Sequence, residues 1–514
     1  MVGFTRGHRL GPQWSAQQNA AGSCGAENRR RNEVADIAGV ASADCHIKLL
    51  KRAAVTVDPI PYSLRFDGGI ADMHEEAGAG GASVAERIGD VMQHLGIDAA
   101  HLAVSVPMEL APFMAANADA VSSLTLLNAS RFPLDVLPSM TDRLLAFTGD
   151  GGLCGEAMQR VKPALAGAEI VEFADYPAAV WTDMAADHAD AIGGSLLAFL
   201  RRQDEQRPAT ILSAAPREGA SAGISFQISG SGPVVLMFPA ALAASQWDSL
   251  IDDLAADFTV VRLGGPHLGM VALLEDRGGD PSSIRTLRSM LHDAQVQPTD
   301  QLLEVGCGSG VIARWLAREC LCATPVTALD LNPFLLREAR ALADAEGLGD
   351  AVVFETGNAE ALPYDDSAFD VVLSVTLIEE CDADKAIAEM ARVVRPGGRL
   401  AIKVRACDMN VFWNLPVEAQ IKAKADQPIR QVGPAGCADA SLLPRMRRAG
   451  LQSVIAYPTF FTGAAHQDYF EPIILSRLDD DEQAAWRTAK EAALAEGSYY
   501  MMHPAHCAVG TKPG

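Results

Sequence analysis

Three glycines at alternate positions constrain the fold of this chain more than any other feature. Gly306, Gly308 and Gly310 directly follow an apolar run. Glycine adopts positive φ at little steric cost, so a turn of this composition points backbone N–H groups at a ligand from close range. A second apolar run, 325–330, ends in Asp330. The layout predicts a strand, a tight turn that opens a helix, and a second strand whose terminal carboxylate holds a ribose.

Length and charge limit the class of protein. A chain of 514 residues suits two or three domains. Hydrophobic residues make up 49% of it, as expected of well-buried globular domains, and the formal net charge of −23 opposes binding to phosphate backbones. No apolar run reaches the roughly 18 residues of a membrane helix. We therefore expect a globular protein without a nucleic-acid partner or a membrane segment.

Cysteine usage bears on the cellular compartment and on metals. The ten cysteines include no Cys-x-x-Cys pair, a pattern that indicates reduced thiols in a cytoplasm. Cys320, Cys322, His503, His506 and Cys507 are residue types that bind metals, but they form no complete ligand set with suitable spacing. The sequence therefore predicts a cytoplasmic protein without a metal site.

Polar stretches divide the chain into units. Segments with helical and strand-like periodicity alternate after the first 60 residues, which predicts an α/β fold with parallel strands. Among the expected helices are 84–95, 111–120 and 185–201, and polar residues at 275–284 suggest a boundary. The predicted organisation is a poorly structured leader at 1–60, a unit at 61–202, a linker at 203–222, a unit at 223–275 and a unit at 286–514.

Further motifs follow the glycine turn in a fixed order. Asn332 and Pro333 suit the start of a helix. The stretches 357–360, 369–374 and 395–398 then supply a polar turn, an apolar strand and a Pro-Gly-Gly turn. With these motifs, the unit at 286–514 resembles class I S-adenosylmethionine-dependent methyltransferases of the small-molecule group. The resemblance implies a Rossmann-like, mostly parallel seven-stranded sheet that ends in an antiparallel hairpin at 452–460 and 498–511.

The resemblance also implies a site for S-adenosylmethionine. Glu304 is expected near the ammonium group and Asp330 at both ribose hydroxyls. Asn358 stands where many relatives have aspartate, and its carbonyl oxygen can accept the same hydrogen bond from the adenine amine. The implied cofactor-binding residues are Glu304, Gly306, Cys307, Gly308, Gly310, Asp330, Leu331, Asn358, Ala359 and Ser374.

The acceptor site is less defined by the sequence. Methyl transfer requires mainly orientation, desolvation and a deprotonated nucleophile, so no obligatory catalytic residue is implied. Glu379 is either a pocket carboxylate beside the sulfonium or a solvated acid before a helix capped by Asp382. Trp413, His466 and Tyr469 either line the acceptor site or belong to ordinary core and surface.

The unit at 61–202 resembles the later part of an α/β-hydrolase. Ser105, Asp150 and His188 follow predicted strands in the chain order of that family's catalytic triad. Ala103 and Pro107 replace the two glycines that flank the nucleophile, which makes the strained turn costly.

Residues 223–275 resemble the early part of the same fold, with Pro239-Ala240 where His-Gly is usual. One hypothesis is that the two hydrolase-like segments complete one permuted sheet. The alternative is that both are remnants of two modules, kept for structure or interaction.

The primary functional hypothesis is methyl transfer to a small-molecule acceptor. A bifunctional protein with a working hydrolase at Ser105, Asp150 and His188 is the second, and a regulatory protein that binds the cofactor without turnover is the third. The sequence leaves open the acceptor, the methylated atom and the oligomeric state.

Overall fold

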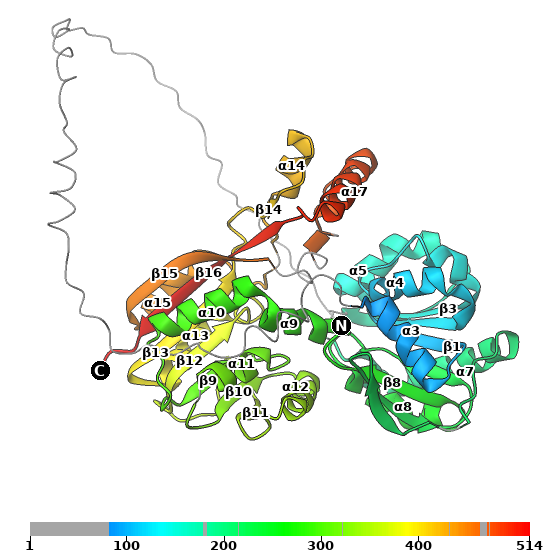
Figure 1. Cartoon of the computed structure of the whole chain (residues 1–514), viewed down its shortest axis with the longest axis horizontal. Helices are drawn as coiled ribbons and strands as arrows, with labels where there is room; N and C mark the ends of the chain where they lie inside the picture. Colours follow the sequence, from blue (N-terminus) through cyan, green and yellow to red (C-terminus); the bar gives the residue numbers. More distant parts are fainter. Residues whose placement is uncertain are drawn as a thin grey trace, which may run out of the picture. The chain divides into compact units, whose positions relative to one another are not determined.

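Two eight-stranded sheets organise the computed structural model of this protein (Figure 1). The described residues are 82–177, 182–213, 215–320, 322–430, 432–462, 470–471 and 473–514. The leader expected at 1–60 and the residues His466 and Tyr469 lie outside them. Across the described residues, no helix combines the length and the apolarity required to cross a bilayer.

The first sheet has the strand order β4-β3-β2-β1-β7-β8-β6-β5. The six strands β4-β3-β2-β1-β7-β8 are parallel to one another, whereas β6 is antiparallel to both of its neighbours, β8 and β5. The strands are β1 Ala100–Val104, β2 Val121–Leu127, β3 Leu144–Gly151, β4 Glu169–Pro177, β5 Glu218–Ser221, β6 Ile224–Gly230, β7 Val234–Met237 and β8 Thr259–Gly264.

Helices cover both faces of this sheet because successive strand residues point to opposite sides and the central strands are buried and mainly apolar on both. One buried cluster joins strand residues such as Leu102 and Leu236 to α3 and α4, and a second joins residues such as Ala103 and Val235 to α6, α7 and α8. The elements are α3 Val84–Leu95, α4 Pro107–Ala116, α5 Gly152–Val161, α6 Met184–Asp187, α7 Ala189–Gln206 and α8 Asp248–Ala255, with short 3-10 turns η1 Ala118–Ala120, η2 Leu137–Arg143, η3 Lys162–Leu165 and η4 Ala244–Trp247.

The pairing of β1 with β7 joins two distant stretches of sequence. His101 and Val235 are partners in this parallel pair, so residues 100–177 and 218–264 form a single sheet. The single sheet agrees with the permutation hypothesis, while the relation of this unit to α/β-hydrolases remains a prediction.

Several predicted boundaries in this unit differ from the structure. The helix expected at 111–120 spans 107–116, because Pro107 suits a first helical position. The helix expected at 185–201 is interrupted at His188, and its second part extends to Gln206. The linker expected at 203–222 is shorter at both ends, since α7 extends to Gln206 and Glu218–Ser221 pairs with β6.

The second sheet has the strand order β11-β10-β9-β12-β13-β16, and β14 and β15 both pair with β16. The first five strands are parallel, and β16 is antiparallel to β13 and to β15. The Rossmann-like sheet with a terminal antiparallel hairpin is therefore confirmed. The strands are β9 Leu302–Val305, β10 Val326–Asp330, β11 Val352–Thr356, β12 Phe369–Val375, β13 Val394–Arg405, β14 Phe412–Trp413, β15 Gln452–Phe461 and β16 Met501–Thr511.

Helices cover both faces of the second sheet as well. One buried cluster joins strand residues such as Leu302 and Ala328 to α10, α11 and α12, and another joins residues such as Leu303 and Leu329 to α13 and α15. The helices of this part are α9 Gly269–Gly279, α10 Pro281–Asp293, α11 Val311–Glu319, α12 Pro333–Ala345, α13 Ala383–Val393, α14 Ala419–Ala425, α15 Leu442–Arg448 and α17 Asp480–Ala495.

Helices α9 and α10 occupy the stretch 275–284, where the polar residues suggest a boundary. Asp280 caps α10 by accepting a hydrogen bond from the backbone N–H of Ser283 at 2.8 Å. Glu275, in the same stretch, accepts hydrogen bonds from Ser309 and Arg314 of the second unit.

A small separate core stands at one end of the second sheet, and we call it the cap. It comprises β14, α14, residues 470–471 and 473–478, and α17, which pack around Trp413 and Trp486. Lys424 of α14 forms an ion pair with Glu482 of α17 at 2.6 Å, and Figure 1 shows these two helices together. The cap joins the sheet where β16 begins at Met501, which is the end where the parallel strand β13 finishes. It therefore lies at the carboxyl edge of the parallel strands, where ligands bind in such sheets.

Candidate functional site

The glycine turn links β9 to α11 with a backbone that only glycine adopts readily. Gly306, Gly308 and Gly310 have φ values of +80°, +54° and +74°. The N–H of Gly306 donates to the carbonyl of Leu329 on β10 at 2.7 Å, and the N–H of Gly310 donates to Cys307 at 2.8 Å. The turn is thus fastened to the neighbouring strand at the carboxyl edge of the sheet.

Asp330 ends β10 directly beside this turn. Its carboxylate accepts hydrogen bonds from the N–H groups of Gly308 at 2.8 Å and Asn332 at 2.9 Å. Burial raises the pKa of Asp330 from its ordinary value, and these two donors oppose that rise. A carboxylate offers about four lone-pair positions, so two remain for a pair of ribose hydroxyls.

Three apolar side chains lie directly on the glycines. A Cβ atom on Gly306 would lie 2.8 Å from Leu377, one on Gly308 would lie 2.8 Å from Leu274, and one on Gly310 would lie 2.5 Å from Phe354. Any larger residue would collide with these neighbours. The glycines therefore serve close packing as well as backbone conformation.

Helix α9 is tied to the glycine turn by a buried ionic cluster. Glu275 accepts short hydrogen bonds from the Ser309 hydroxyl and the Arg314 guanidinium. Arg314 is 1% exposed and also donates to the Ser309 carbonyl at 2.7 Å. The cluster places Leu274 over Gly308. Sequence reasoning missed Glu275 because it lies in the stretch taken for a boundary.

The side of the turn expected to receive adenine is partly open. Leu331 follows Asp330 and is 66% exposed, which leaves an apolar surface for the face of a purine. Asn358 is exposed, and its side-chain carbonyl accepts the N–H of Glu360 at 2.9 Å. The second lone pair of that oxygen is available to an amine. Ala359 is buried next to it.

The remaining predicted cofactor residues are buried in the sheet. The Ser374 hydroxyl donates to the carbonyl of Val305 at 3.0 Å, so it fastens β12 to β9. Glu304 is 1% exposed on β9. Burial raises the pKa of the Cys307 thiol well above its ordinary value, so this group is not a thiolate at neutral pH. Direct contact of these side chains with a cofactor remains a prediction.

Glu379 is neither a solvated acid nor an open pocket group. It is fully buried, accepts the N–H of Arg405 at 2.8 Å and lies 3.6 Å from the Arg405 guanidinium. Burial raises its pKa, and Arg405 opposes the rise. One carboxylate oxygen has no hydrogen-bond partner. Glu379 therefore fastens the end of β13 to the segment after β12.

Thr376 was not singled out in the sequence, yet it has the most unusual backbone at this edge. It follows β12 with φ of +53°, although a β-branched residue rarely adopts positive φ. Its hydroxyl is buried without a hydrogen-bond partner. Strained backbone persists where surrounding structure imposes it, often at functional sites. Nothing in the sequence pattern signals this conformation.

Trp413 belongs to the cap core. It is 1% exposed, and its ring lies 5.2 Å from that of Trp486 in an edge-on arrangement. Core packing is therefore its role in this structure. The other two aromatic candidates lie outside the described residues.

The hydrolase-like residues do not form a connected triad in the described part of the chain. Asp150 accepts the N–H groups of Asp175 and Tyr176, at 2.7 and 3.0 Å. His188 stacks on Phe173 with ring centroids 3.9 Å apart, and its Nε2 is buried without a partner. No hydrogen bond joins Ser105, which is buried, to either of them. None of residues 103–107 has positive φ, so the strained turn of a nucleophile elbow is not present.

Comparisons with known proteins address the second unit. Residues 303–402 match the family described as "Methyltransferase domain". The chain is 39% identical over 132 residues to "Methyltransferase GfsG" of Streptomyces halstedii, which covers 24% of this chain and 47% of that protein. It is 34% identical over 159 residues to "27-O-demethylrifamycin SV methyltransferase" of Amycolatopsis mediterranei (strain S699), covering 30% of this chain and 54% of that protein.

The chain thus spans about half the length of these curated relatives. Among solved structures, a putative methyltransferase from Bacillus halodurans C-125 aligns with a TM-score of 0.31 and 19% identity, covering 45% of this chain and 100% of that chain.

A stretch of the second unit is thus similar to methyltransferase domains. The matched residues begin in β9 and end in β13, and they include the glycine turn and Asp330. S-adenosylmethionine is the methyl donor expected from this similarity, and the residues at the site fit that molecule. The positive-φ turn offers backbone groups, Asp330 retains acceptor positions, and exposed Leu331 offers an apolar surface to a base.

Proposed function

We propose that this protein transfers a methyl group from S-adenosylmethionine to a small-molecule acceptor by in-line displacement. The observation that carries the proposal is the glycine turn at 306–310 joined to Asp330 by the hydrogen bond from Gly308. When bound, the cofactor supplies an electrophilic methyl group on a sulfonium.

The contribution of the chain itself is placement. The N–H groups of the turn and the Asp330 carboxylate orient the nucleoside end of the cofactor. Leu377 and Leu274, which lie on the glycines, exclude water from the same edge. The cap stands beside the end of β13, at the edge of the sheet where ligands of such folds bind. These features support orientation and desolvation without a dedicated acid or base.

Calorimetry and labelled methyl donor test this function. We expect the full-length protein to bind S-adenosylmethionine, and untargeted metabolite profiling with a labelled methyl group to show a product that is missing with Asp330→Ala. If the wild-type chain does not bind the methyl donor, the proposal is wrong. If it binds the donor and labels nothing, the regulatory alternative replaces it.

A further inference from the structure

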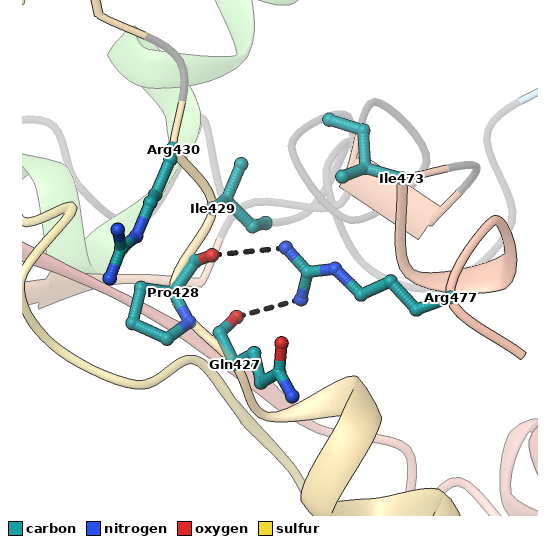
Figure 2. Close-up of a pocket in the computed structure, with 6 residues that line it drawn as sticks. All are labelled: Gln427, Pro428, Ile429, Arg430, Ile473 and Arg477. Atoms are coloured by element: carbon teal, nitrogen blue, oxygen red, sulfur yellow. Dashed lines mark hydrogen bonds between the residues drawn. The ribbon is translucent and has the colours of Figure 1, made fainter.

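A pocket of about 480 Å³ lies at the base of the cap, and its lining is unusual for so acidic a protein. Figure 2 shows the guanidinium of Arg477 reaching toward the loop after α14, with Ile429 and Ile473 beside it and Arg430 extending from the same loop past Pro428. The lining is Gln427, Pro428, Ile429, Arg430, Ile473 and Arg477. Two cations and three apolar side chains therefore face this space without a lining carboxylate.

Several acidic groups of the cap are paired with lysines. Asp426 lies 3.1 Å from Lys422, and Glu482 lies 2.6 Å from Lys424. Glu471 accepts Lys490 at 2.6 Å and the Trp486 indole N–H at 3.0 Å. Asp479, two residues after Arg477, caps α17 by accepting the N–H of Glu482 at 2.9 Å. In the described structure none of these carboxylates forms an ion pair with Arg430 or Arg477.

Within the described residues, neither pocket arginine has an ion-pair partner. Arg477 donates to the carbonyls of Gln427 at 2.8 Å and Pro428 at 3.0 Å, which fixes its position but leaves its charge unbalanced. A guanidinium has five N–H donors, so others remain for a ligand. Burial lowers the pKa of Arg477, because desolvation disfavours its charged form. An anion in the pocket would offset that penalty.

A continuous set of contacts connects the pocket to the cofactor turn. The pocket loop continues to Gly433, whose N–H donates to the carbonyl of Glu379 at 2.8 Å. Three residues span at most about 11 Å, so Arg430 lies within that reach of Gly433. Two residues before Glu379, Leu377 lies on Gly306. The loop that lines the pocket is therefore linked, through Gly433 and the segment 377–379, to the glycine turn.

We propose that Arg430 and Arg477 bind the acidic group, a carboxylate or a phosphate monoester, of an acceptor whose apolar part lies against Ile429 and Ile473. This inference rests on the proposed function and specifies its substrate class. Arginine binds both kinds of anion through paired N–H donors. The pocket also gives a negatively charged acceptor a local positive region on a protein with a net charge of −23.

Short amphiphiles test the pocket without knowledge of the natural acceptor. Hexanoate, hexyl phosphate and neutral hexanamide would be titrated into the full-length protein by calorimetry with saturating S-adenosylhomocysteine. We expect one or both anions to bind at least tenfold more tightly than hexanamide, and the comparison of the two anions identifies the preferred acidic group. Arg477→Gln and Arg430→Gln should each weaken anion binding at least tenfold.

Two further variants separate the pocket from general effects. Arg487 is exposed on α17 and bonded to Gln483, so Arg487→Gln makes the same charge change in the cap away from the pocket lining and should leave anion binding unchanged. Arg477→Lys keeps the charge and should retain part of the affinity. S-adenosylhomocysteine binding should be equal in all variants, which checks that the domain remains folded.

The outcomes distinguish this inference from the proposed function. Equal binding of hexanamide and the anions, absence of anion binding, or equal losses in Arg487→Gln and Arg477→Gln would each overturn the anion pocket. If the wild type binds anions through the two arginines but does not bind S-adenosylhomocysteine, the pocket stands and the proposed methyl transfer fails.

Discussion

In each sheet, one parallel strand ends near an aspartate whose carboxylate accepts two backbone N–H groups. The two carboxylates differ in where these donors come from. Asp330 receives one of its hydrogen bonds from Gly308 of the positive-φ turn. Asp150 receives both from β4, through Asp175 and Tyr176, and is exposed. Only Asp330 therefore has a glycine turn among its donors, which is why we propose it, and not Asp150, as a ligand group.

The turn after β9 and the turn after β1 also differ in backbone conformation. After β9 the chain has three glycines with positive φ, while after β1 none of residues 103–107 has it. The first turn presents backbone to a ligand. The second, with Ala103 and Pro107, begins a helix without strain.

Gly310→Ala tests whether packing as well as φ requires glycine in the turn. The new Cβ would lie 2.5 Å from Phe354 at a φ of +74°, so we expect a loss of about 3 kcal/mol in the free energy of unfolding. Gly96 ends α3 with φ of +70° and open space around it, so Gly96→Ala should cost only about 1 kcal/mol. Urea unfolding of both variants measures the difference, and equal losses would contradict the packing argument.

Asp330→Ala tests the ribose contact. Hydrogen bonds to a charged group are worth about 1.5–3 kcal/mol, so we expect S-adenosylmethionine affinity to fall roughly 10- to 100-fold. Asp150→Ala removes a strand-end carboxylate with the same number of backbone donors and should leave that affinity unchanged. Calorimetry on both variants measures the effect. Unchanged affinity in Asp330→Ala would mean that the ribose is held elsewhere.

Glu109, which is half-buried, and Glu379, which is fully buried, should respond to pH and substitution in opposite ways. Glu109 on α4 accepts only the N–H of Gly269 at 3.2 Å, and burial raises its pKa to about 7. Because the pKa of Glu109 is higher in the folded protein than in the unfolded chain, folding favours its protonated form. The resulting contribution to the free energy of unfolding is complete below about pH 4.5 and is lost as the pH rises through 7. Glu109→Gln should therefore stabilise the protein at pH 8.

The expected gain is about 1–2 kcal/mol, because each pKa unit corresponds to about 1.4 kcal/mol and Glu109 is only half-buried. Glu379→Gln should instead destabilise at pH 8, since Arg405 would lose its buried counter-charge. Urea unfolding at pH 5 and pH 8 measures both variants. A gain for Glu109→Gln that is equal at the two pH values would refute the titration argument.

Ser105 provides the smallest expected effect. Because residues 103–107 lack positive φ and no hydrogen bond joins Ser105 to His188 in the described structure, we expect no fluorophosphonate labelling. If the wild type is labelled and Ser105→Ala is not, the bifunctional hypothesis is restored. The second unit would then no longer be the only one of the two with a proposed functional turn.

Local sequence rules predicted the elements whose residues carry their own signals. Ser83 and Glu86 form a capping box, and Gly96 ends α3 with positive φ, so this helix appears at its predicted bounds. The glycine turn and Asp330 were likewise readable, because glycine and a strand-end carboxylate have few substitutes there.

The rest depended on contacts between residues distant in sequence. The role of Glu275 is defined by Arg314 and Ser309, and that of Glu379 by Arg405. Their own neighbours in the chain are polar and suggested a loop or a solvated surface. The positive φ of Thr376 is imposed by the surrounding sheet edge and contradicts its intrinsic preference.

The pairing of β1 with β7 also sets the order in which the chain can fold during synthesis. Strands β1 to β4 are made first, but one edge of β1 has no partner until Val234–Met237 emerges, more than 50 residues after β4 ends. An unpaired edge in an incomplete sheet invites pairing with other chains. The nascent first unit is therefore expected to need protection by chaperones until residue 264 has been made, whereas the second sheet waits for its strand β16, which is made almost 100 residues after β13.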